Sequence, residues 1–533
     1  MKALLVHPEF SHHGFWNYQE VCRLAGAKYP AAPLGLITLA ALLPQDWQIR
    51  LIDMNSAPLG DDDIAWADLV FAGGMLPQQV ALLKLVERVH DLGRKMVVGG
   101  PDPTSQPTVY ASADYLVLGE GECTVPLFLR DLEAHVDSGI YEPDELRPDV
   151  TQSPVPRFDL LRFEDYLMIG IQVTRGCPFN CEFCDIIELY GRVPRAKTPH
   201  QIIEELETLY SLGYRGHIDF VDDNFIGNKK RLKETLNAIK GWSIAHRYPF
   251  FFSTEASINL ADDEELLELM RDIDFRYVFV GIEAVDDLTL RASNKNQNLN
   301  REIVGDLEKL YSYGMIVNGG FIVGFDSETS GSARSIADLV RDGRICMAMV
   351  GLLNALPNTR LTRRLHEEGR LIEDSNLLGE DDSSCADQTT MGLNFVTLRA
   401  RAEIVDDYLY VIREIYGARA YFARCLHLAR SLRPNQLHRP SVVEAFKMLV
   451  AFGRVVLRLG ILPPVALYFW RNIMVVLVSR PANIEPLVNV MSMYIHFRRQ
   501  SAHIVDAVQR VSEAKLPMRF RLAEGAAGPH GWS

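Results

Sequence analysis

Residues 173–186 read VTRGCPFNCEFCDI, and this stretch decides how the centre of the chain is interpreted. It holds Cys177, Cys181 and Cys184 in the spacing C-x₃-C-x₂-C, directly after a strand-like run. Three thiolates on one short loop can surround a soft metal centre and leave one iron open to another molecule. A structural zinc would need a fourth ligand, and no other Cys or His lies nearby in the sequence. The stretch therefore predicts a [4Fe-4S] cluster on the three cysteines, with a structural zinc and a simple electron-carrying cluster as the alternatives.

Strand-like runs separated by amphipathic helical segments continue through the centre of the chain. They lie at 169–174, 217–223, 250–256, 277–283, 317–324 and 349–355. Such alternation is typical of a parallel sheet with helices packed on it. Six βα units are fewer than the eight of a closed barrel. We therefore expect residues 167–398 to form a partial (β/α)₆ barrel, with the cysteine loop after its first strand.

Residues 1–140 alternate in the same way, with strand-like runs at 2–7, 49–54, 67–73, 95–100 and 114–119. This pattern predicts an α/β fold with an N-terminal doubly wound, Rossmann-like sheet, which binds ligands at the carboxyl ends of its strands. Glycine-rich turns follow three of the runs, although glycines that only make tight turns are the alternative. No G-x-G-x-x-G follows the first run, which disfavours a nicotinamide cofactor.

The rest of the chain divides by composition. Four prolines among charged residues predict an extended linker at 141–166. From residue 399 the strand pattern gives way to helical periodicity, so we expect an α-helical C-terminal domain at 399–520 and a flexible tail at 521–533. Residues 401–533 contain 18 Lys and Arg against 9 Asp and Glu, whereas the whole chain has a net charge of −14. The C-terminal region is therefore chemically distinct.

The overall composition excludes several classes of protein. Apolar residues make up 48% and charged residues 23%, which is typical of a folded globular chain. The negative net charge argues against a nucleic acid partner, and eight unevenly spaced cysteines do not make a disulfide framework. The first residues, MKALLVHPEF, form a strand-like run without a small-residue cleavage site, so we expect no signal peptide. The longest apolar stretch, 461–478, is interrupted by two prolines, Arg471 and Asn472. We expect a cytoplasmic protein without a transmembrane anchor.

The cysteine motif, with an aromatic residue before its third cysteine, resembles that of the radical S-adenosylmethionine (SAM) superfamily. The resemblance implies that the open iron of the cluster binds the amino and carboxylate groups of SAM. It also implies further SAM contacts, although a solvated or capping role is the alternative for each acid. These contacts are Phe183 in the motif, Asp222 and Asp223 near the methionine, Ser253, Glu255 and Glu283 near the ribose, and Gly320, Ile322 and Gly324 along the adenine. The acid expected three positions after the last glycine is replaced by Ser327, with Glu328 one residue later.

A doubly wound domain before such a core is similar to the cobalamin-binding, class B subgroup of the superfamily. The resemblance implies cobalamin contacts at Asp53, Asn55, Gly73, Gly74, Gly99, Gly100, Pro101, Gly119 and Gly121. The D-x-H-x-x-G signature of His-ligated cobalamin proteins is missing, because residues 53–60 read DMNSAPLG. We expect no His of that motif to ligate cobalt, and we interpret His7, His12 and His13 as polar loop residues.

The whole chain is similar to the branch of the superfamily that contains the hopanoid C-2 methylases, whose substrate is a membrane triterpenoid. This resemblance implies an enzyme that cleaves SAM reductively and uses cobalamin to methylate an unactivated carbon of a small molecule or lipid. It also implies an electron donor such as a flavodoxin or ferredoxin. Two alternatives stay open. The first is a cobalamin-dependent radical SAM enzyme for rearrangement, cyclisation or methylthiolation, and the second is a non-catalytic corrinoid-binding sensor.

Long apolar segments and arginines are combined in residues 440–499. The arginines are Arg454, Arg458, Arg471, Arg480, Arg498 and Arg499. This combination predicts peripheral contact with the inner face of a membrane, because cations are drawn to anionic headgroups while aliphatic side chains enter the acyl boundary. The alternative is that the helices pack on the barrel and the arginines form its solvated rim.

Overall fold

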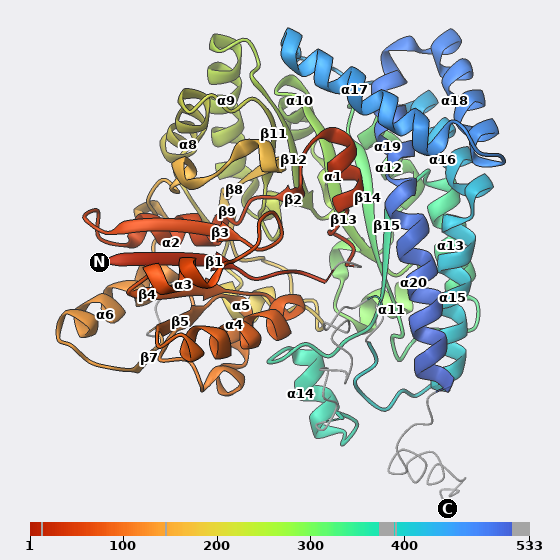
Figure 1. Cartoon of the computed structure of the whole chain (residues 1–533). Coiled ribbons are helices and arrows are strands. Elements are labelled where there is room, and N and C mark those ends of the chain that lie inside the picture. Colours follow the sequence, from red (N-terminus) through yellow and green to blue (C-terminus); the bar gives the residue numbers. More distant parts are fainter. Residues whose placement is uncertain (12–13, 144–146, 373–388, 390–391, 514–533) are drawn as a thin grey trace, which may run out of the picture.

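The part of the chain that the structure describes contains two large parallel β-sheets, a small antiparallel pair of strands and a helical C-terminal region (Figure 1). The computed structural model describes residues 1–11, 14–143, 147–372, 389 and 392–513. His12, His13 and the tail at 521–533 therefore lie outside the described residues. The predicted fold class is confirmed: a doubly wound N-terminal sheet, a curled partial barrel and a C-terminal region that is helical wherever it is described.

The N-terminal sheet has the strand order β3-β1-β4-β5-β6-β7, and all its pairings are parallel. In β1, Leu4 and Val6 face the core under α3 and α4, while Ala3 and Leu5 face the core under α2 and α6. Both faces are buried, which explains the continuous apolar runs in the sequence. The elements are β1 (Lys2–His7), α2 (Leu34–Leu42), β3 (Gln48–Asp53), α3 (Asp61–Trp66), β4 (Leu69–Gly73), α4 (Gln79–Asp91), β5 (Lys95–Gly99), α5 (Pro101–Ser105), β6 (Tyr115–Val117), α6 (Gly121–Glu133) and β7 (Gly139–Tyr141).

The second sheet has seven parallel strands in the order β15-β14-β13-β12-β11-β8-β2. Six of them overlap the runs expected for the partial barrel, although β8, β11, β14 and β15 end before the expected runs do. They are β8 (Tyr166–Ile171), β11 (Gly216–Phe220), β12 (Phe250–Ala256), β13 (Phe275–Glu283), β14 (Ile316–Val323) and β15 (Ala348–Leu352). The accompanying helices are α7 (Ile186–Tyr190), α8 (Pro199–Ser211), α9 (Lys229–Ala245), α10 (Glu264–Asp272), α11 (Asp287–Ala292), α12 (Ile303–Ser312), α13 (Ser332–Asp342) and α14 (Arg360–Glu367). Between β7 and β8 the chain makes three short 3₁₀ turns.

The seventh strand, β2 (Tyr29–Ala31), comes from the N-terminal segment and was not among the expected strands. Tyr29 pairs with Tyr166 and Ala31 with Met168, so the chain leaves the first sheet, adds an edge to the second and returns. Three residues that include a proline give no periodic signal, and a proline is tolerated at a sheet edge. The N-terminal segment is therefore tied to the second sheet by backbone pairing.

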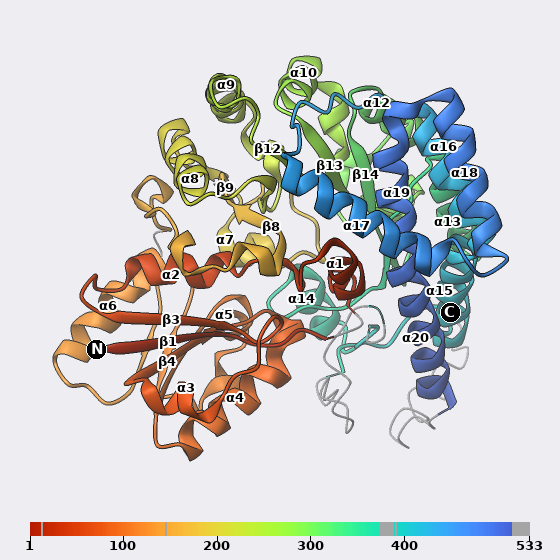
Figure 2. The same cartoon turned by 45° about the horizontal axis from the view of Figure 1, so that its top comes forward.

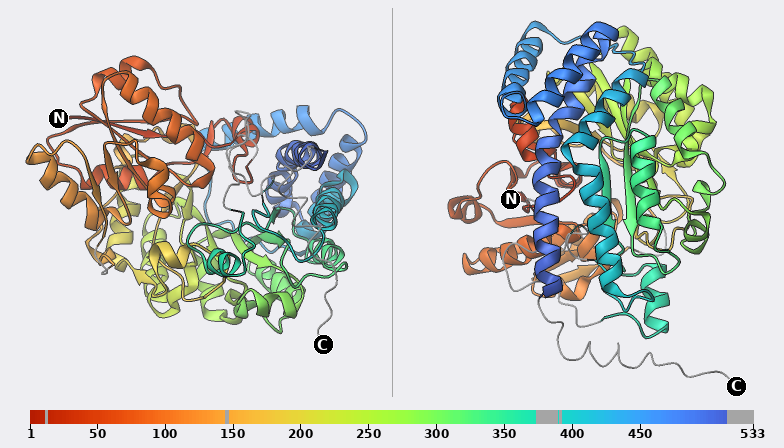
Figure 3. Two further views of the ribbon diagram at one scale, coloured as in Figure 1. Left: turned by 90° about the horizontal axis from the view of Figure 1, so that it is seen from below. Right: turned by 90° about the vertical axis from the view of Figure 1, so that its right-hand side faces the viewer.

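Six helices form the C-terminal region: α15 (Arg401–Tyr416), α16 (Ala418–Ser431), α17 (Val442–Leu459), α18 (Val465–Ser479), α19 (Ile484–Ser492) and α20 (Tyr494–Glu513). The long helices α15 and α20 run side by side (Figure 3). Helix α1 (Gln19–Ala25) and α17 lie together in front of β13 and β14 (Figure 2), and Arg454 Nη1 donates to the carbonyls of Arg23 and Leu24, both at 3.1 Å. Within the described residues, no helix is both long and apolar enough to span a bilayer.

Candidate active site

The cysteine loop follows β8 and is fastened at its base by a small antiparallel pair, β9 (Thr174–Arg175) with β10 (Arg195–Ala196). Gly176 precedes the first cysteine with φ +92°, and a Cβ there would lie 2.8 Å from the Gly191 carbonyl oxygen. The turn therefore requires glycine, because it closes one end of the loop on the other. The loop presents Cys177, Cys181 and Cys184, all unpaired thiols.

Side-chain amides lie within hydrogen-bonding distance of two of these thiols. The amide of Asn224 lies 3.8 Å from Cys177 Sγ and that of Gln297 lies 3.6 Å from Cys181 Sγ. Burial disfavours the charge on Lys295, but Glu283 and Cys181 outweigh it and raise the pKa of the ammonium group. Thiolates that accept N–H bonds beside a cation suit an anionic iron–sulfur cluster. The three cysteines thus fit the predicted cluster, and their ligation of it stays a prediction.

Asp222 and Asp223 hold the base of this loop. Asp222 accepts hydrogen bonds from the backbone of Val173 (3.0 Å) and from the backbone and hydroxyl of Thr174, and Asp223 accepts one from the backbone of Gly176 at 2.9 Å. Burial raises the pKa of Asp222 to about 7 and that of Asp223 to about 6. These partners give both acids a positioning role beneath the cysteines, and their contact with SAM stays a prediction.

Ser253 and Glu255 point into the partial barrel from alternate positions of β12. The Ser253 hydroxyl lies 2.7 Å from His217 Nε2 and also donates to Asp219 on the neighbouring strand β11. Burial and the charge of Arg276 lower the pKa of His217 to about 3, so this imidazole is neutral near pH 7. Burial, followed by the neighbouring carboxylates led by Asp219, raises the pKa of Glu255 to about 8.

Replacing Glu255 by glutamine is expected to make protein stability less dependent on pH. The folded protein holds this proton up to about pH 8, whereas the unfolded chain releases it near pH 4.5, so the wild type loses stability as the pH rises through that window. The stabilisation of Glu255→Gln over the wild type should therefore be small at pH 5 and larger at pH 8.5. Thermal unfolding of both proteins at the two pH values measures this stability difference. The control is Glu204→Gln, at an exposed position. A constant difference between the two pH values would contradict the assignment.

The remaining predicted SAM residues lie at or near the ends of β13 and β14. Glu283 pairs with Lys295 at 2.9 Å. Glu328 reaches back to accept the Gly324 N–H at 2.9 Å, and burial raises its pKa to about 7. A Cβ on Gly320 would lie 2.7 Å from the Phe279 ring, and the Phe183 ring packs 5.8 Å from that of Phe325. Ile322 is half-buried in β14. The contacts of these residues with SAM stay predictions.

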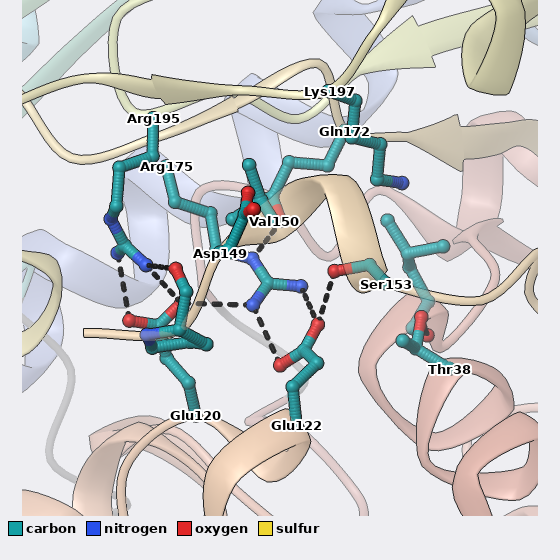
Figure 4. Close-up of polar contacts among 12 residues, drawn as sticks. Thr38, Glu120, Glu122, Asp149, Val150, Ser153, Gln172, Arg175, Arg195 and Lys197 are labelled. Carbon is teal, nitrogen blue, oxygen red and sulfur yellow. Dashed lines mark hydrogen bonds and ion pairs between the residues drawn. The ribbon is translucent and has the colours of Figure 1, made fainter. Parts of the chain in front are cut away.

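An ion-pair network that the sequence did not indicate joins the cysteine loop to the N-terminal domain (Figure 4). Arg175 Nη2 lies 2.8 Å from Glu122 Oε1 and its Nη1 lies 2.9 Å from Glu120 Oε2, while Arg195 Nη2 binds Glu120 at 2.7 Å. Burial favours neutral Glu122, but Arg175 outweighs it and lowers the pKa of that acid to about 2. A lone arginine beside a cysteine motif carries no periodic signal, so only the fold could reveal these partners.

Asp53 and Asn55, predicted to contact cobalamin, are buried after β3. Asp53 accepts from Tyr166 Oη at 3.0 Å and from the Asn55 side chain at 2.8 Å, and it lies 3.2 Å from His7 Nδ1. Asn55 in turn donates to the Pro8 carbonyl at 3.1 Å. The pair fixes the loop after β1 and ties it to β8, and direct contact with cobalamin stays a prediction.

The glycines predicted to contact cobalamin have packing reasons of their own. Gly100 has φ +97°, and a Cβ there would lie 2.9 Å from the Gly74 nitrogen, so any side chain would disturb the protein itself. Pro101 is the first residue of α5. A Cβ would meet protein atoms within 3.3 Å at each of the other five, namely Gly73, Gly74, Gly99, Gly119 and Gly121. These positions therefore require glycine for packing within the protein. Contact of their backbone with cobalamin stays a prediction.

A cavity of about 1240 Å³ lies inside the partial barrel. Residues of β11–β15 line it on one side, both apolar or aromatic (Phe251, Tyr277, Phe279 and Met349) and polar or charged (His217, Asp219, Ser253, Thr254, Glu255, Arg276 and Asn318). Residues of α1, α17 and α19 close the side that the sheet leaves open. The volume exceeds the range of about 300–1,000 Å³ usual for small-molecule pockets, so the cavity can hold a large apolar molecule.

Comparison with known families identifies the class of protein. The family described as the radical SAM superfamily matches residues 171–340, which include the cysteine loop and most of the partial barrel. A domain of unknown function, DUF4070, matches residues 359–510, nearly all of the helical region. The chain is a radical SAM enzyme, and this class implies a [4Fe-4S] cluster and SAM.

Two curated relatives narrow the class. The chain is 38% identical over 504 residues to the uncharacterized methyltransferase sll1242 of Synechocystis sp., covering 93% of this chain and 91% of the relative. It is 34% identical over 500 residues to the hopanoid C-2 methylase of Rhodopseudomonas palustris, covering 91% and 92%. The chain therefore belongs to this family of radical SAM methyltransferases. The fold is similar to that of the radical SAM methyltransferase TsrM from Kitasatospora setae, solved with cobalamin and a [4Fe-4S] cluster bound (TM-score 0.57, 16% identity, 84% of this chain and 94% of that chain).

Proposed function

We propose that this enzyme methylates an unactivated carbon of a hydrophobic polycyclic lipid of the hopanoid class, by cobalamin-dependent radical SAM chemistry. The cavity inside the partial barrel carries the proposal. Phe251, Phe279, Met347 and Met349 line its walls and give a polycyclic hydrocarbon an apolar surface to contact. The hopanoid class follows the name of the relative that shares 34% identity along nearly the whole chain.

The bound cluster, SAM and cobalamin would supply the radical and methyl-transfer chemistry. The protein's own groups would orient them. Cys177, Cys181 and Cys184 would hold three irons, while the amides of Asn224 and Gln297 donate to the sulfurs. The apolar cavity walls and the covering helices would exclude water, which a reactive substrate carbon requires.

Cobalamin would bind at the carboxyl edge of the N-terminal sheet. The strand order reverses direction between β1 and β4, and ligands of doubly wound sheets bind at such a point. Gln78 fastens the two loops there, donating to the Pro8 carbonyl at 2.7 Å and accepting from Met75 N at 3.0 Å. Met75 itself is 48% exposed at this edge, an apolar surface that a corrin ring could cover.

Substituting Met75 by arginine should therefore weaken cobalamin binding by about tenfold, the effect of losing about 1.4 kcal/mol of apolar contact. Titration of the full chain with hydroxocobalamin measures the affinity. Ile140, which is 63% exposed on β7 at the far edge of the same sheet, supplies the control Ile140→Arg, and this variant should bind like the wild type. Equal loss in both variants, or none in Met75→Arg, would place the corrin elsewhere.

The proposed function requires two further partners. An electron donor such as a flavodoxin or ferredoxin would reduce the cluster. A lipid substrate also requires contact with the membrane surface, and the basic C-terminal region would provide it.

The deciding experiment incubates the anaerobically reconstituted protein with cobalamin, a reductant, SAM carrying a deuterated methyl group, and a hopanoid in detergent. We expect 5′-deoxyadenosine together with a product that has gained the labelled methyl group. Deoxyadenosine with a rearranged, cyclised or methylthiolated product would instead favour the other cobalamin-dependent chemistry. Absence of deoxyadenosine would favour a corrinoid sensor. The Cys181→Ala protein serves as the blank.

A further inference from the structure

Helices α17 and α18 follow each other in the chain and meet at one end, at the surface of the C-terminal region (Figures 1 and 2). Residues 442–479, which form the two helices and their connection, are called the α17–α18 hairpin. The first half of α17 is unusual, because its apolar residues are exposed around the helix: Val442 is 88%, Val443 65%, Phe446 66% and Leu449 66% exposed. A helix that is apolar all round is normally buried. Exposed apolar residues continue along the hairpin as Leu457, Ile461, Leu462, Leu467, Trp470, Met474, Leu477 and Val478. So many exposed apolar side chains on two successive helices indicate an interaction site.

The charge of this hairpin indicates what it contacts. Residues 445–484 contain no Asp or Glu. They contain five cations, which are Lys447, Arg454, Arg458, Arg471 and Arg480. The whole chain carries a net charge of −14, so the hairpin is a basic surface on an acidic protein. Exposed apolar side chains flanked by cations are complementary to an anionic bilayer, in which both the acyl boundary and the headgroups find partners.

The apolar surface is continuous with the mouth of the cavity. Phe446, Leu449 and Val450 are exposed on the surface and also line the cavity. Arg454 fastens the next turn of α17 to α1, so the two helices meet at this opening. The arginines at the far end of the region behave differently, because Arg499 on α20 pairs with Glu20 of α1. Arg499 is therefore engaged within the protein, whereas the features that favour a lipid contact lie on the α17–α18 hairpin.

We propose that the α17–α18 hairpin inserts its apolar side chains into the surface of an anionic bilayer and that the cavity opens directly into it beside α17. This proposal rests on the proposed function for its lipid substrate. A polycyclic hydrocarbon would then pass from the bilayer into the cavity without crossing water, which avoids the cost of exposing its apolar surface. The hairpin acts as both the membrane anchor and the rim of the substrate entrance.

Flotation of the full-length protein with vesicles of phosphatidylglycerol and phosphatidylcholine tests the contact. The variant Leu457→Asp/Leu462→Asp/Val478→Asp changes three hairpin residues that do not line the cavity. It should float at least tenfold less than the wild type. The control Ile140→Asp/Ile244→Asp/Leu398→Asp places the same charges at similarly exposed apolar positions elsewhere and should float like the wild type. Binding should also weaken with added salt and in pure phosphatidylcholine.

Activity separates this proposal from the proposed function. The hairpin variant should methylate substrate in detergent as fast as the wild type, but substrate embedded in vesicles at least tenfold more slowly. If neither protein methylates the lipid, the proposed function fails while flotation still reports on the hairpin. Equal flotation of wild type and hairpin variant, or none by the wild type, would overturn the proposal. A dimer that the hairpin substitutions dissociate, without flotation, would assign the surface to a second copy of the chain.

Discussion

Alanine at Cys181 will leave the protein without its cluster and without SAM cleavage. Each thiolate binds one iron, and the structure offers no substitute, because the described cysteines outside the loop lie on other elements. We expect iron to fall from about four per chain to below one after reconstitution. Formation of 5′-deoxyadenosine should fall to the level of the blank without protein.

Cys123→Ala provides the matched control. Cys123 is a partly exposed thiol of α6, outside the loop, so this variant should keep its iron and its activity. Circular dichroism checks that both variants fold. A full complement of iron in Cys181→Ala would contradict the assignment of the three cysteines, whereas loss of iron in both variants would point to misfolding.

The cysteine loop and the six strands of the partial barrel could be predicted because their signals are local. The three cysteines lie within eight residues, and each strand is a short run rich in aliphatic and aromatic residues that alternates with a helical segment. Strand β2 could not be predicted, because its three residues pair with β8 more than a hundred positions away. The contacts of Asn224 with Cys177 and of Gln297 with Cys181 could not be predicted either. Each joins residues that are far apart in the sequence and that only the fold brings together.

The predicted residues of the N-terminal domain show a second limit of sequence reasoning. A glycine at a strand end can serve a ligand or the protein, and the sequence is the same in both cases. At Gly100 the structure gives a reason within the protein, since the Gly74 backbone occupies the space of a side chain. The side chain of Asp53 is likewise directed to Tyr166 and Asn55. Side chains that hold a loop in place therefore resemble ligand contacts when only the sequence is known.

Methionine at Arg175 is expected to destabilise the protein by about 3–5 kcal/mol, the usual effect of breaking a buried ion pair. Glu120 would keep its ion pair with Arg195. The buried carboxylate of Glu122 would lose its cation and keep, among side chains, the hydrogen bond from the Ser153 hydroxyl at 2.6 Å. The base of the cysteine loop would also lose one of its two arginine contacts with the N-terminal domain, while Arg195–Glu120 remains. Less methylated product should therefore form for each deoxyadenosine, because the two halves of the site are no longer held in register.

A double-mutant cycle separates the loss of the pair from other damage. In Arg175→Met/Glu122→Gln the orphaned charge is gone, so much of the lost stability should return. The product ratio should stay low, because Arg175 no longer links the cysteine loop to Glu120 and Glu122. Arg162→Met, at an exposed position paired with Glu164, should change stability by less than about 1 kcal/mol.

The pH dependence of stability gives an independent check. Because Arg175 holds the pKa of Glu122 at about 2, below its ordinary value of 4.5, the pair stabilises the wild type above pH 4.5 and loses its effect as the pH falls toward 2. The difference in thermal midpoint between wild type and Arg175→Met should therefore shrink over that range. A difference that stays constant down to pH 3, or a product ratio equal to that of the wild type, would show that this network does not hold the two domains together.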